Sequence, residues 1–233
     1  GMINDGIIST KLGIPGISDL AEKIIIERDL SLLEEINCRY HISQISSKKS
    51  LDLIAFKKNI VNFTTGVSIN NLALNENDIG EFKTFLKVSP PLRTEEDRVA
   101  LIEGINNNLI DVIVSDHKPE DEESKRLTFS QAATGASGIE TFLSLALEQF
   151  HNGSIKLEKI IELITHNPAK ILKINKGNLN VGSDGDFCIV DINKPWVVKK
   201  ENFVSKSKNT SIEGRKLQGK VISTFVNGQE LYK

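Results

Sequence analysis

A carboxylate and an imidazole stand side by side at Asp116 and His117, directly after the apolar run of residues 110–114. The run is rich in β-branched residues, which is typical of a strand buried on both faces. Parallel α/β folds place their chemistry at the carboxyl ends of such strands. Asp116 and His117 are therefore candidates for proton transfer or metal binding. The alternative is a polar strand end that only begins a loop.

The remaining histidines give weaker signals. His41 lies in a predicted strand, where a histidine is more often a hydrogen-bonded core residue than a ligand. His151 and His166 have no carboxylate or cysteine at a useful spacing, and we interpret them as surface and helix-cap residues. The acidic run of residues 120–123 is interpreted as a solvated face of a charged loop, residues 117–128.

Strands that alternate with helices must position these residues. Residues 2–17 carry several glycines and show no period, so we predict a loop there. Ser18, Ser47 and the Thr94/Asp97 pair are helix-start signals. The pattern predicts strands over 39–45, 60–67 and 110–115, an extended segment over 82–88, and helices over 18–37, from 47, from 94, and over 138–150, 157–165 and 167–172. This alternation predicts a parallel sheet with right-handed crossovers.

The pattern changes after residue 175. Glycines punctuate short extended segments over 187–191, 196–198, 220–226 and 230–232, and Asn227-Gly228 is a hairpin signal. We therefore predict two domains, an α/β domain over 1–175 and a small all-β appendage over 176–233. Trp196, the single tryptophan, is expected to fill the core of that appendage.

Composition narrows the function classes. The 233 residues are 39% hydrophobic and 26% charged, with a formal net charge of -2. This balance gives no footprint for nucleic acid or an acidic membrane. Two cysteines make no disulfide framework, and no leader or membrane-spanning run is visible, so we expect a cytoplasmic protein. Gly1-Met2 reads as a tag-removal scar before a native start.

Several segments in order resemble the C-terminal half of a dihydroorotase, a family of the amidohydrolase superfamily. The Val88–Arg98 tract is similar to the family's Asn-Pro-Pro-Leu-Arg segment, and Ile110–Pro119 resembles its Asp-Val-Ile-Xaa-Thr-Asp-His-Ala-Pro segment. Further resemblances lie at residues 4–29, 135–141, 167–172, 182–186 and 213–219. Each motif is modest, but their order and spacing make the set specific.

The resemblance implies the second half of a (β/α)8 TIM barrel, strands five to eight, with a small C-terminal β-sandwich appendage. It implies the reversible cyclisation of carbamoyl-aspartate to dihydroorotate in pyrimidine biosynthesis, with zinc activating the attacking water. The family's strand-eight aspartate, which binds metal and shuttles the proton, corresponds to Asp116. The substrate-binding positions correspond to Ser89, Arg93, His117 and Gly135.

This chain departs from the family at the metal positions. The strand-five ligand position is Gln44, while His41 survives nearby, and the strand-six His-His pair is replaced by Asn70 and Asn71. The strand-one His-Xaa-His and the bridging carboxylate lie in a half that the chain does not contain. Asp116 is the one firm metal ligand, with His41 and His117 weak, so we expect zinc to be absent or weakly bound.

Three readings of function follow. The first is a pseudoenzyme, inactive alone, that acts as a structural partner, with aspartate carbamoyltransferase as a candidate. The second is one piece of a split or truncated active dihydroorotase that needs an N-terminal half-barrel chain. The third is the product of a decaying gene that folds by self-association. Because half a barrel leaves unpaired strand edges, we expect a homo-oligomer or a complementary protein subunit, and neither nucleic acid nor membrane as a partner.

Overall fold

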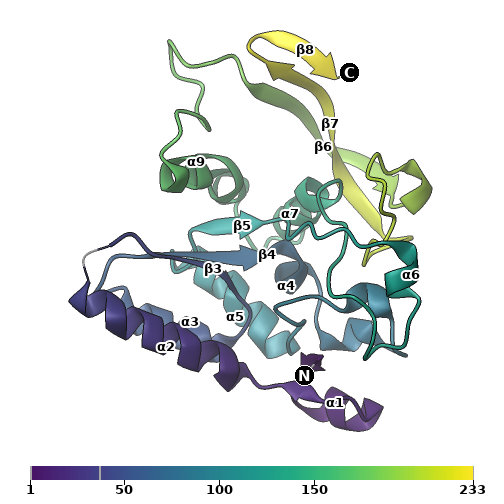
Figure 1. The fold of residues 1–233 in the computed structure, drawn as a ribbon. Coiled ribbons are helices and arrows are strands. Elements are labelled where there is room, and N and C mark those ends of the chain that lie inside the picture. Colours follow the sequence, from purple (N-terminus) through teal and green to yellow (C-terminus); the bar gives the residue numbers. More distant parts are fainter. Residues whose placement is uncertain (1, 37, 233) are drawn as a thin grey trace.

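The computed structural model describes residues 2–36 and 38–232, and its strands form three separate sheets (Figure 1). The strands are β1 Ile3–Asn4, β2 Gly16–Ile17, β3 His41–Ile45, β4 Thr64–Ser68, β5 Val112–Val114, β6 Phe187–Val197, β7 Lys216–Val226 and β8 Gln229–Tyr232. The α-helices are α1 Ile7–Leu12, α2 Asp19–Glu35, α3 Lys48–Lys57, α4 Ile69–Ala73, α5 Glu95–Asn106, α6 Glu122–Lys125, α7 Phe142–His151, α8 Leu157–Ile161 and α9 Asn167–Leu172. The short helical turns are η1 Glu76–Ile79, η2 Thr84–Leu86, η3 Glu162–His166 and η4 Lys200–Asn202.

The central sheet has the order β3-β4-β5, and all its strands are parallel, as predicted. The helices α2, α3 and α5 lie along one side of it (Figure 1). Three helix starts have the predicted caps: the hydroxyls of Ser18 and Ser47 accept backbone N–H groups, and Thr94 forms a capping box with Asp97. These local signals fix where the crossover helices begin, and so where the strands end.

Two predictions for the first ninety residues were wrong. Residues 2–17 are not a loop, because β1 and β2 pair in parallel around α1, and Ile3 is 1% exposed. Residues 82–88 are not extended, because backbone hydrogen bonds from Leu86 to Lys83 and from Lys87 to Thr84 close the turn η2. The central sheet therefore has three strands where four extended segments were expected, and β4 pairs directly with β5.

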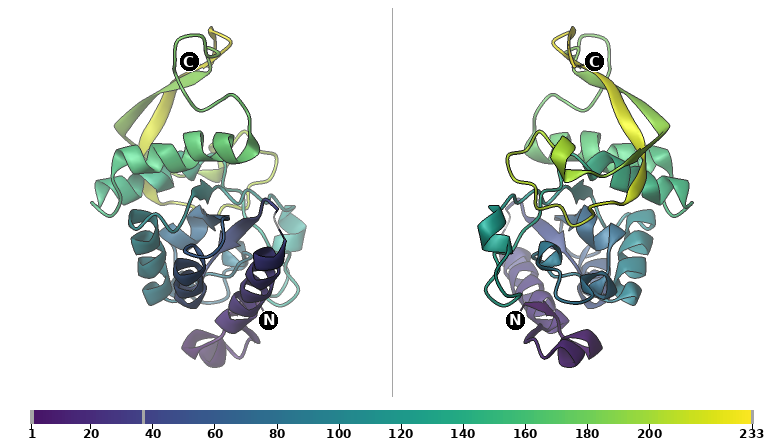
Figure 2. Two further views of the ribbon diagram at one scale, coloured as in Figure 1. Left: turned by 90° about the vertical axis from the view of Figure 1, so that its left-hand side faces the viewer. Right: turned by 90° about the vertical axis from the view of Figure 1, so that its right-hand side faces the viewer.

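The third sheet is antiparallel with the order β6-β7-β8. Within the described residues it is a single layer, so the predicted sandwich is corrected to one sheet. The two strands predicted over 187–198 are one continuous strand, β6. Asn227 and Gly228 both have positive φ, 50° and 76°, which confirms the predicted hairpin turn. Figure 2 shows the end of this sheet near the C-terminus extending beyond the helices.

The third sheet is attached to the α/β part through α7. The indole Nε1 of Trp196 donates to Ser144 Oγ at 3.1 Å, and that hydroxyl donates to the carbonyl of Gly219 at 2.7 Å. Leu217 of β7 belongs to the same hydrophobic core as β3 and β4. Trp196 thus packs at a junction between the two parts and does not fill the core of the appendage alone. The division into domains 1–175 and 176–233 stays a prediction. No helix in the described ranges is long and apolar enough to cross a membrane.

Candidate functional site

Gln44, Asn70 and Asp116 come together at the carboxyl ends of the central strands. Gln44 is the penultimate residue of β3, Asn70 lies two residues after the end of β4, and Asp116 lies two residues after the end of β5. Because the three strands are parallel neighbours, their ends meet at one edge of the sheet. The amide Nε2 of Gln44 donates to Asp116 Oδ1 at 3.0 Å. The structure therefore unites three of the positions that the sequence assigned to one site.

Asp116 is held in an unusual environment. Burial raises the pKa of its carboxyl group, whereas the neighbouring polar groups of Gln44, Asn70 and Ser68 and the charge of Lys118 lower that pKa. Its backbone φ is +47°, in the left-handed region that few non-glycine residues adopt. Backbone strain of this kind concentrates at functional sites, where the surrounding structure holds it in place.

The two asparagines at the expected histidine positions are deeply buried, each 3% exposed. Asn71 donates to the carbonyl of Pro91 at 2.9 Å, but its Oδ1 has no hydrogen-bond partner among the described residues. Asn70 Nδ2 has none either in the described part of the chain. Leaving buried polar atoms unsatisfied costs about 1–3 kcal/mol each. The surrounding fold therefore leaves one polar atom of each amide without a hydrogen bond.

His41 does not join this site. It is the first residue of β3 and lies three residues before Gln44, about 10 Å along the strand. Its Nδ1 lies 2.7 Å from the hydroxyl of Thr64, and burial lowers the pKa of its ring while Asp111 raises it. It lines a separate cavity of about 1140 Å³ with Tyr40, Thr64 and Asp111. The expectation that His41 and Asp116 share a metal is thus not met by the geometry.

His117 is turned toward the following loop. Its Nδ1 accepts the backbone N–H groups of Gly138 and Ile139 at 3.2 and 3.3 Å. A ring nitrogen that accepts carries no proton, so the hydrogen of the neutral ring sits on Nε2. His117 also forms a parallel bridge with Ala136. The ring is therefore positioned by residues 136–139.

Gly135 lies beside this bridge and is required by close packing. Its φ is +145°, and a Cβ there would come within 2.6 Å of the carbonyl oxygen of Lys118. Ser89 lies on the surface. The substrate contacts assigned to Gly135 and Ser89 stay predictions.

Arg93 is buried in a polar network, at 3% exposure. Its guanidinium donates to Ser46 Oγ at 3.0 Å, to Asn4 Oδ1 at 2.9 Å and to the carbonyl of Ile17. Asn4 in turn donates to Glu76 at 2.7 Å. The network ties β1 and β2 to the end of β3, which explains the burial of Arg93, while its predicted contact with substrate stays untested. Sequence reasoning missed Asn4 and Glu76, because these partners are 72 residues apart.

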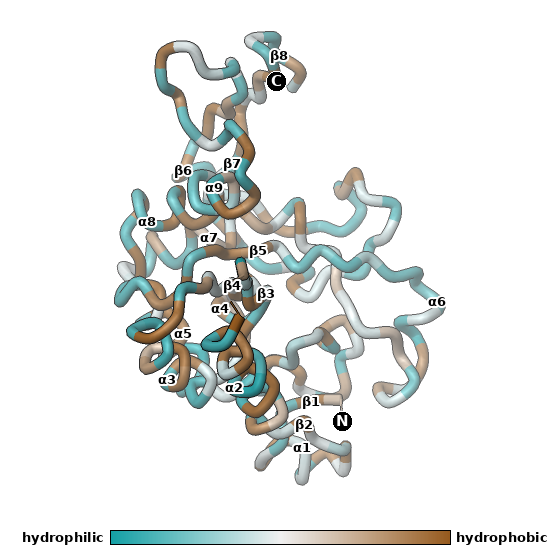
Figure 3. Tube along the Cα trace, turned by 60° about the vertical axis from the view of Figure 1, so that its left-hand side comes forward, coloured by the Kyte–Doolittle hydropathy of each residue, from teal (hydrophilic) through white to brown (hydrophobic). Residues whose placement is uncertain are grey.

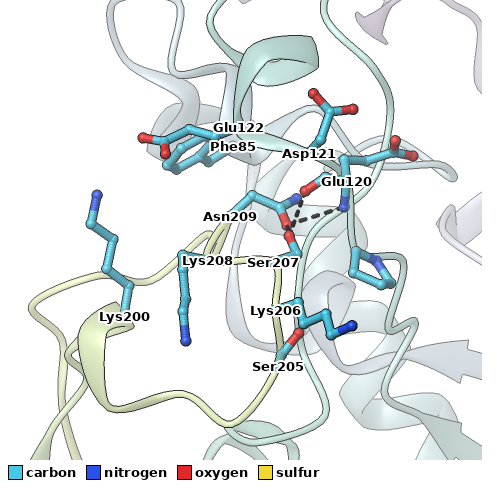
Figure 4. A pocket seen from close by; sticks show the side chains of 11 residues that line it. Phe85, Glu120, Asp121, Glu122, Lys200, Ser205, Lys206, Ser207, Lys208 and Asn209 are labelled. Atoms are coloured by element: carbon cyan, nitrogen blue, oxygen red, sulfur yellow. Dashed lines mark hydrogen bonds between the residues drawn. The ribbon is translucent and has the colours of Figure 1, made fainter.

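The charged segment 117–128 was predicted to be a loop throughout, but it contains the short helix α6, which the side chain of Asp121 caps. Asn209 holds the start of this segment in place. Glu120 N donates to Asn209 Oδ1 at 3.2 Å, and the hydroxyl of Ser207 also bonds to Asn209 (Figure 4). A pocket of about 550 Å³ lies between this loop and residues 200–209. Figure 4 shows its charged side chains, including Glu122 and Lys206, pointing in different directions. They do not converge on a common ligand position.

The donor set at Asp116 does not fit the zinc that the sequence resemblance implies. Within residues 2–36 and 38–232, no three side chains of His, Cys, Asp or Glu cluster in a way that could hold a metal. Gln44 directs an amide N–H at the carboxylate of Asp116, so a hydrogen-bond donor faces the oxygen that would bind the ion. Zinc is normally held by three or four nitrogen, sulfur or carboxylate ligands.

Comparison with known proteins places the fold and the motifs in context. A sequence model of the amidohydrolase family matches residues 9–231. The dihydroorotase of Ehrlichia canis (strain Jake) is 41% identical over all of this chain, which covers 52% of that protein. The dihydroorotase of Aquifex aeolicus (strain VF5) is 40% identical over all of this chain and 55% of that protein. The chain thus spans about half the length of the curated relatives it matches.

Solved structures show the same coverage. The L-hydantoinase (dihydropyrimidinase) of Arthrobacter aurescens has a TM-score of 0.86 and 30% identity, covering 92% of this chain and 49% of that one. The dihydropyrimidinase of Brevibacillus agri NCHU1002 has the same TM-score and coverage at 22% identity, which is a likeness of fold alone.

Proposed function

The chain belongs to the amidohydrolase family, and from this premise we propose that it is a dihydroorotase-type structural subunit that does not catalyse alone. The reaction of dihydroorotases is the zinc-dependent, reversible cyclisation of carbamoyl-aspartate to dihydroorotate in pyrimidine biosynthesis. The observation that carries the proposal is the Gln44–Asp116 hydrogen bond of 3.0 Å, at a position where the resemblance implies a metal ligand. Buried Asn70 and Asn71 at the other ligand positions support it.

The fold proposed for the α/β part is a portion of the second half of a (β/α)8 barrel. The parallel order β3-β4-β5 and the covering helices are consistent with it, and so is the half-length match to relatives. Such a portion leaves β3 and β5 as open edges within the described sheet. Open parallel edges favour pairing with another polypeptide.

Metal content and activity test the first half of this proposal. Purified protein, dialysed without chelator, should hold far less than one zinc per chain, and neither dihydroorotate hydrolysis nor carbamoyl-aspartate cyclisation should exceed the blank. Histidines introduced at Gln44, Asn70 and Asn71 should not restore turnover. Stoichiometric zinc that is lost in Asp116→Ala, or turnover that survives re-purification, would contradict the proposal.

The partner we propose is a protein subunit in the cytoplasm, with aspartate carbamoyltransferase as the first candidate. The support is an apolar stripe on α2 that faces solvent, with Leu20, Ile24 and Leu32 exposed by 47%, 59% and 55%. Sedimentation of the purified chain with and without a purified aspartate carbamoyltransferase tests this. A complex that is abolished by Leu32→Glu supports the proposal, and two independent boundaries at micromolar concentrations oppose it.

A second candidate function is one piece of a split dihydroorotase. The observation that favours it is the half-length coverage combined with the open edges. Co-expression with the first half of the Ehrlichia canis relative tests it directly. Turnover in the co-purified pair would favour the split enzyme over the scaffold, whereas a stable but inactive pair would favour the scaffold.

A further inference from the structure

Two lysines are buried without a carboxylate partner among the described residues. Lys125 is 1% exposed and Lys87 is 8% exposed. Among the ion pairs of residues 2–36 and 38–232, none includes either lysine. Burying an unpaired ammonium group lowers stability, so the presence of a lysine at each of these positions requires a compensating role.

Both ammonium groups bond to the backbone carbonyls of one segment, residues 129–135, which we call the carbonyl loop. Lys87 Nζ donates to the carbonyls of Phe129, Ser130 and Ala132 at 2.9, 3.0 and 2.7 Å. Lys125 Nζ donates to those of Ala133 and Gly135 at 2.7 and 2.9 Å. The segment is neither helix nor strand, so these five carbonyls lack the donors that regular structure would supply.

The carbonyl loop leads directly into the residues that hold His117. The backbone N–H of Gly135 donates to the carbonyl of Lys87 at 2.9 Å. The end of the carbonyl loop is therefore bonded to the backbone of Lys87, the residue whose side chain bonds to the start of the loop. Ala136 then bridges to His117, and Gly138 and Ile139 donate to its ring nitrogen. Asp116 precedes that ring by one residue.

We propose that Lys87 and Lys125 are positioning residues of the candidate site. They hold the carbonyl loop through its carbonyl groups, and the carbonyl loop holds the ring of His117 beside Asp116. Apolar side chains of the same volume at both positions would fill the space but remove these donors, and of the five carbonyls that of Gly135 would still accept from Asn209 Nδ2, at 3.2 Å. The buried charges thus destabilise the protein but fix the carbonyl loop, which leads to the residues that hold His117.

The two lysines differ in what they require. Lys87 satisfies three carbonyls, so it needs all three N–H groups of an ammonium. Lys125 satisfies two, which a neutral amine also does. The pKa of Lys125 is lowered to about 8, mainly by burial, with Glu120 raising it and Lys87 and Lys118 contributing to the lowering. We therefore expect the loop to stay closed on Lys125 on both sides of that pH.

Methionine substitutions in the full chain test the proposal. In Lys87→Met and Lys125→Met, the amides of Gly138 and Ile139 should exchange with solvent about tenfold faster. The ¹⁵N resonance of His117 Nδ1 should move, because it loses its two donors. The amides of α2 serve as internal reference, and Lys83→Met, an exposed lysine four residues before Lys87, is the matched control.

Two results would overturn the proposal. One is an unchanged His117 resonance with unchanged exchange at Gly138 and Ile139 in both variants. The other is equal acceleration in α2, which would reduce the lysines to general stabilisers. If Lys87→Met does not fold, Lys87→Ala with added n-propylammonium replaces it: recovery with n-propylammonium but not with n-propanol supports the proposal, and no recovery with either refutes it.

Discussion

At the scale of single residues, Arg93 has the chemistry of a ligand-binding group but is fully engaged by the protein. Its planar guanidinium bonds to Ser46, Asn4 and the carbonyl of Ile17, and three separate segments depend on it. A lysine cannot reproduce this fork of donors.

We expect Arg93→Met to lower the free energy of unfolding by about 2–4 kcal/mol, because it leaves Asn4 and Glu76 buried without their cation-centred network. Arg93→Lys should recover only part of the loss. Urea unfolding measures both. If the free energy of unfolding of Arg93→Met differs from that of the native protein by less than the error of the fit, the network contributes little to stability. Arg93 would then be a candidate for contact with a ligand again.

Lys125 gives a prediction of pH dependence. Burial lowers its pKa from 10.5 to about 8, while the unfolded chain keeps the ordinary value. Between those two pH values the unfolded state binds more protons than the folded state, so this residue makes stability rise with pH. The free energy of unfolding of the native protein should therefore rise relative to Lys125→Met by about 1–3 kcal/mol from pH 8 to 10.5. The exposed Lys11→Met is the control, and parallel curves for native protein and Lys125→Met would contradict the prediction.

The convergence of the site residues was predictable, and their surroundings were not. Gln44, Asn70 and Asp116 each follow or end a strand, so parallel pairing alone brings them together. The burial of Arg93 and of the lysines depends on partners up to 89 residues away, which no local pattern encodes. The resemblance assigns His41 to the site, whereas the structure places it at the opposite end of β3 from Gln44.

At the scale of elements, α2 has two apolar faces. One face, with Ile26, Leu30 and Leu33, is buried in the core shared with β3. The other, with Leu20, Ile24 and Leu32, faces solvent; Figure 3 shows the apolar residues recurring along this helix. Exposed apolar stripes of this kind mark interaction surfaces.

Substitutions on the two faces should have opposite consequences. Leu30→Ala should cost about 2–5 kcal/mol of stability by opening a cavity. Leu32→Glu should change stability by less than about 0.5 kcal/mol but reduce association. Thermal unfolding and sedimentation together measure both effects. A large loss of stability in Leu32→Glu would mean that this face is already covered in solution by the chain's own residues.

Element starts were predictable where the signal is local. Ser18, Ser47 and Thr94 carry their caps within three residues of the helix start, and all three predictions are confirmed. The prediction of an extended segment over 82–88 was wrong because the conformation there depends on contacts with groups distant in the sequence. Phe82 adopts a φ of +59°, and the side chain of Lys87 is drawn inward by carbonyls more than 40 residues later.

At the scale of the whole molecule, large apolar side chains are exposed on more than one element. Besides α2, the third sheet exposes Ile189 by 50% and Leu231 by 67%. We expect the chain to be larger than a monomer in solution at micromolar concentrations, with the contact through α2 and the central strands.

The double variant Ile24→Glu/Leu32→Glu should lower the mass measured by light scattering, whereas Ile189→Thr on the third sheet should not. The reverse result would move the interface to the third sheet. A monomeric native chain with cooperative unfolding would show that the open edges of β3 and β5 need no partner.

The Arg93 network also sets an order of folding. Asn4 must find Glu76, 72 residues later, and Arg93, 89 residues later, before β1 and β2 are held in place. Closing such long loops is slow compared with forming the local helices. During synthesis, residues 3–17 leave the ribosome well before their partners exist. Residues 3–17 should stay accessible to proteases until Arg93 has been synthesised and buried. Protection of these residues from cleavage should therefore appear late and indicate that the central sheet has formed.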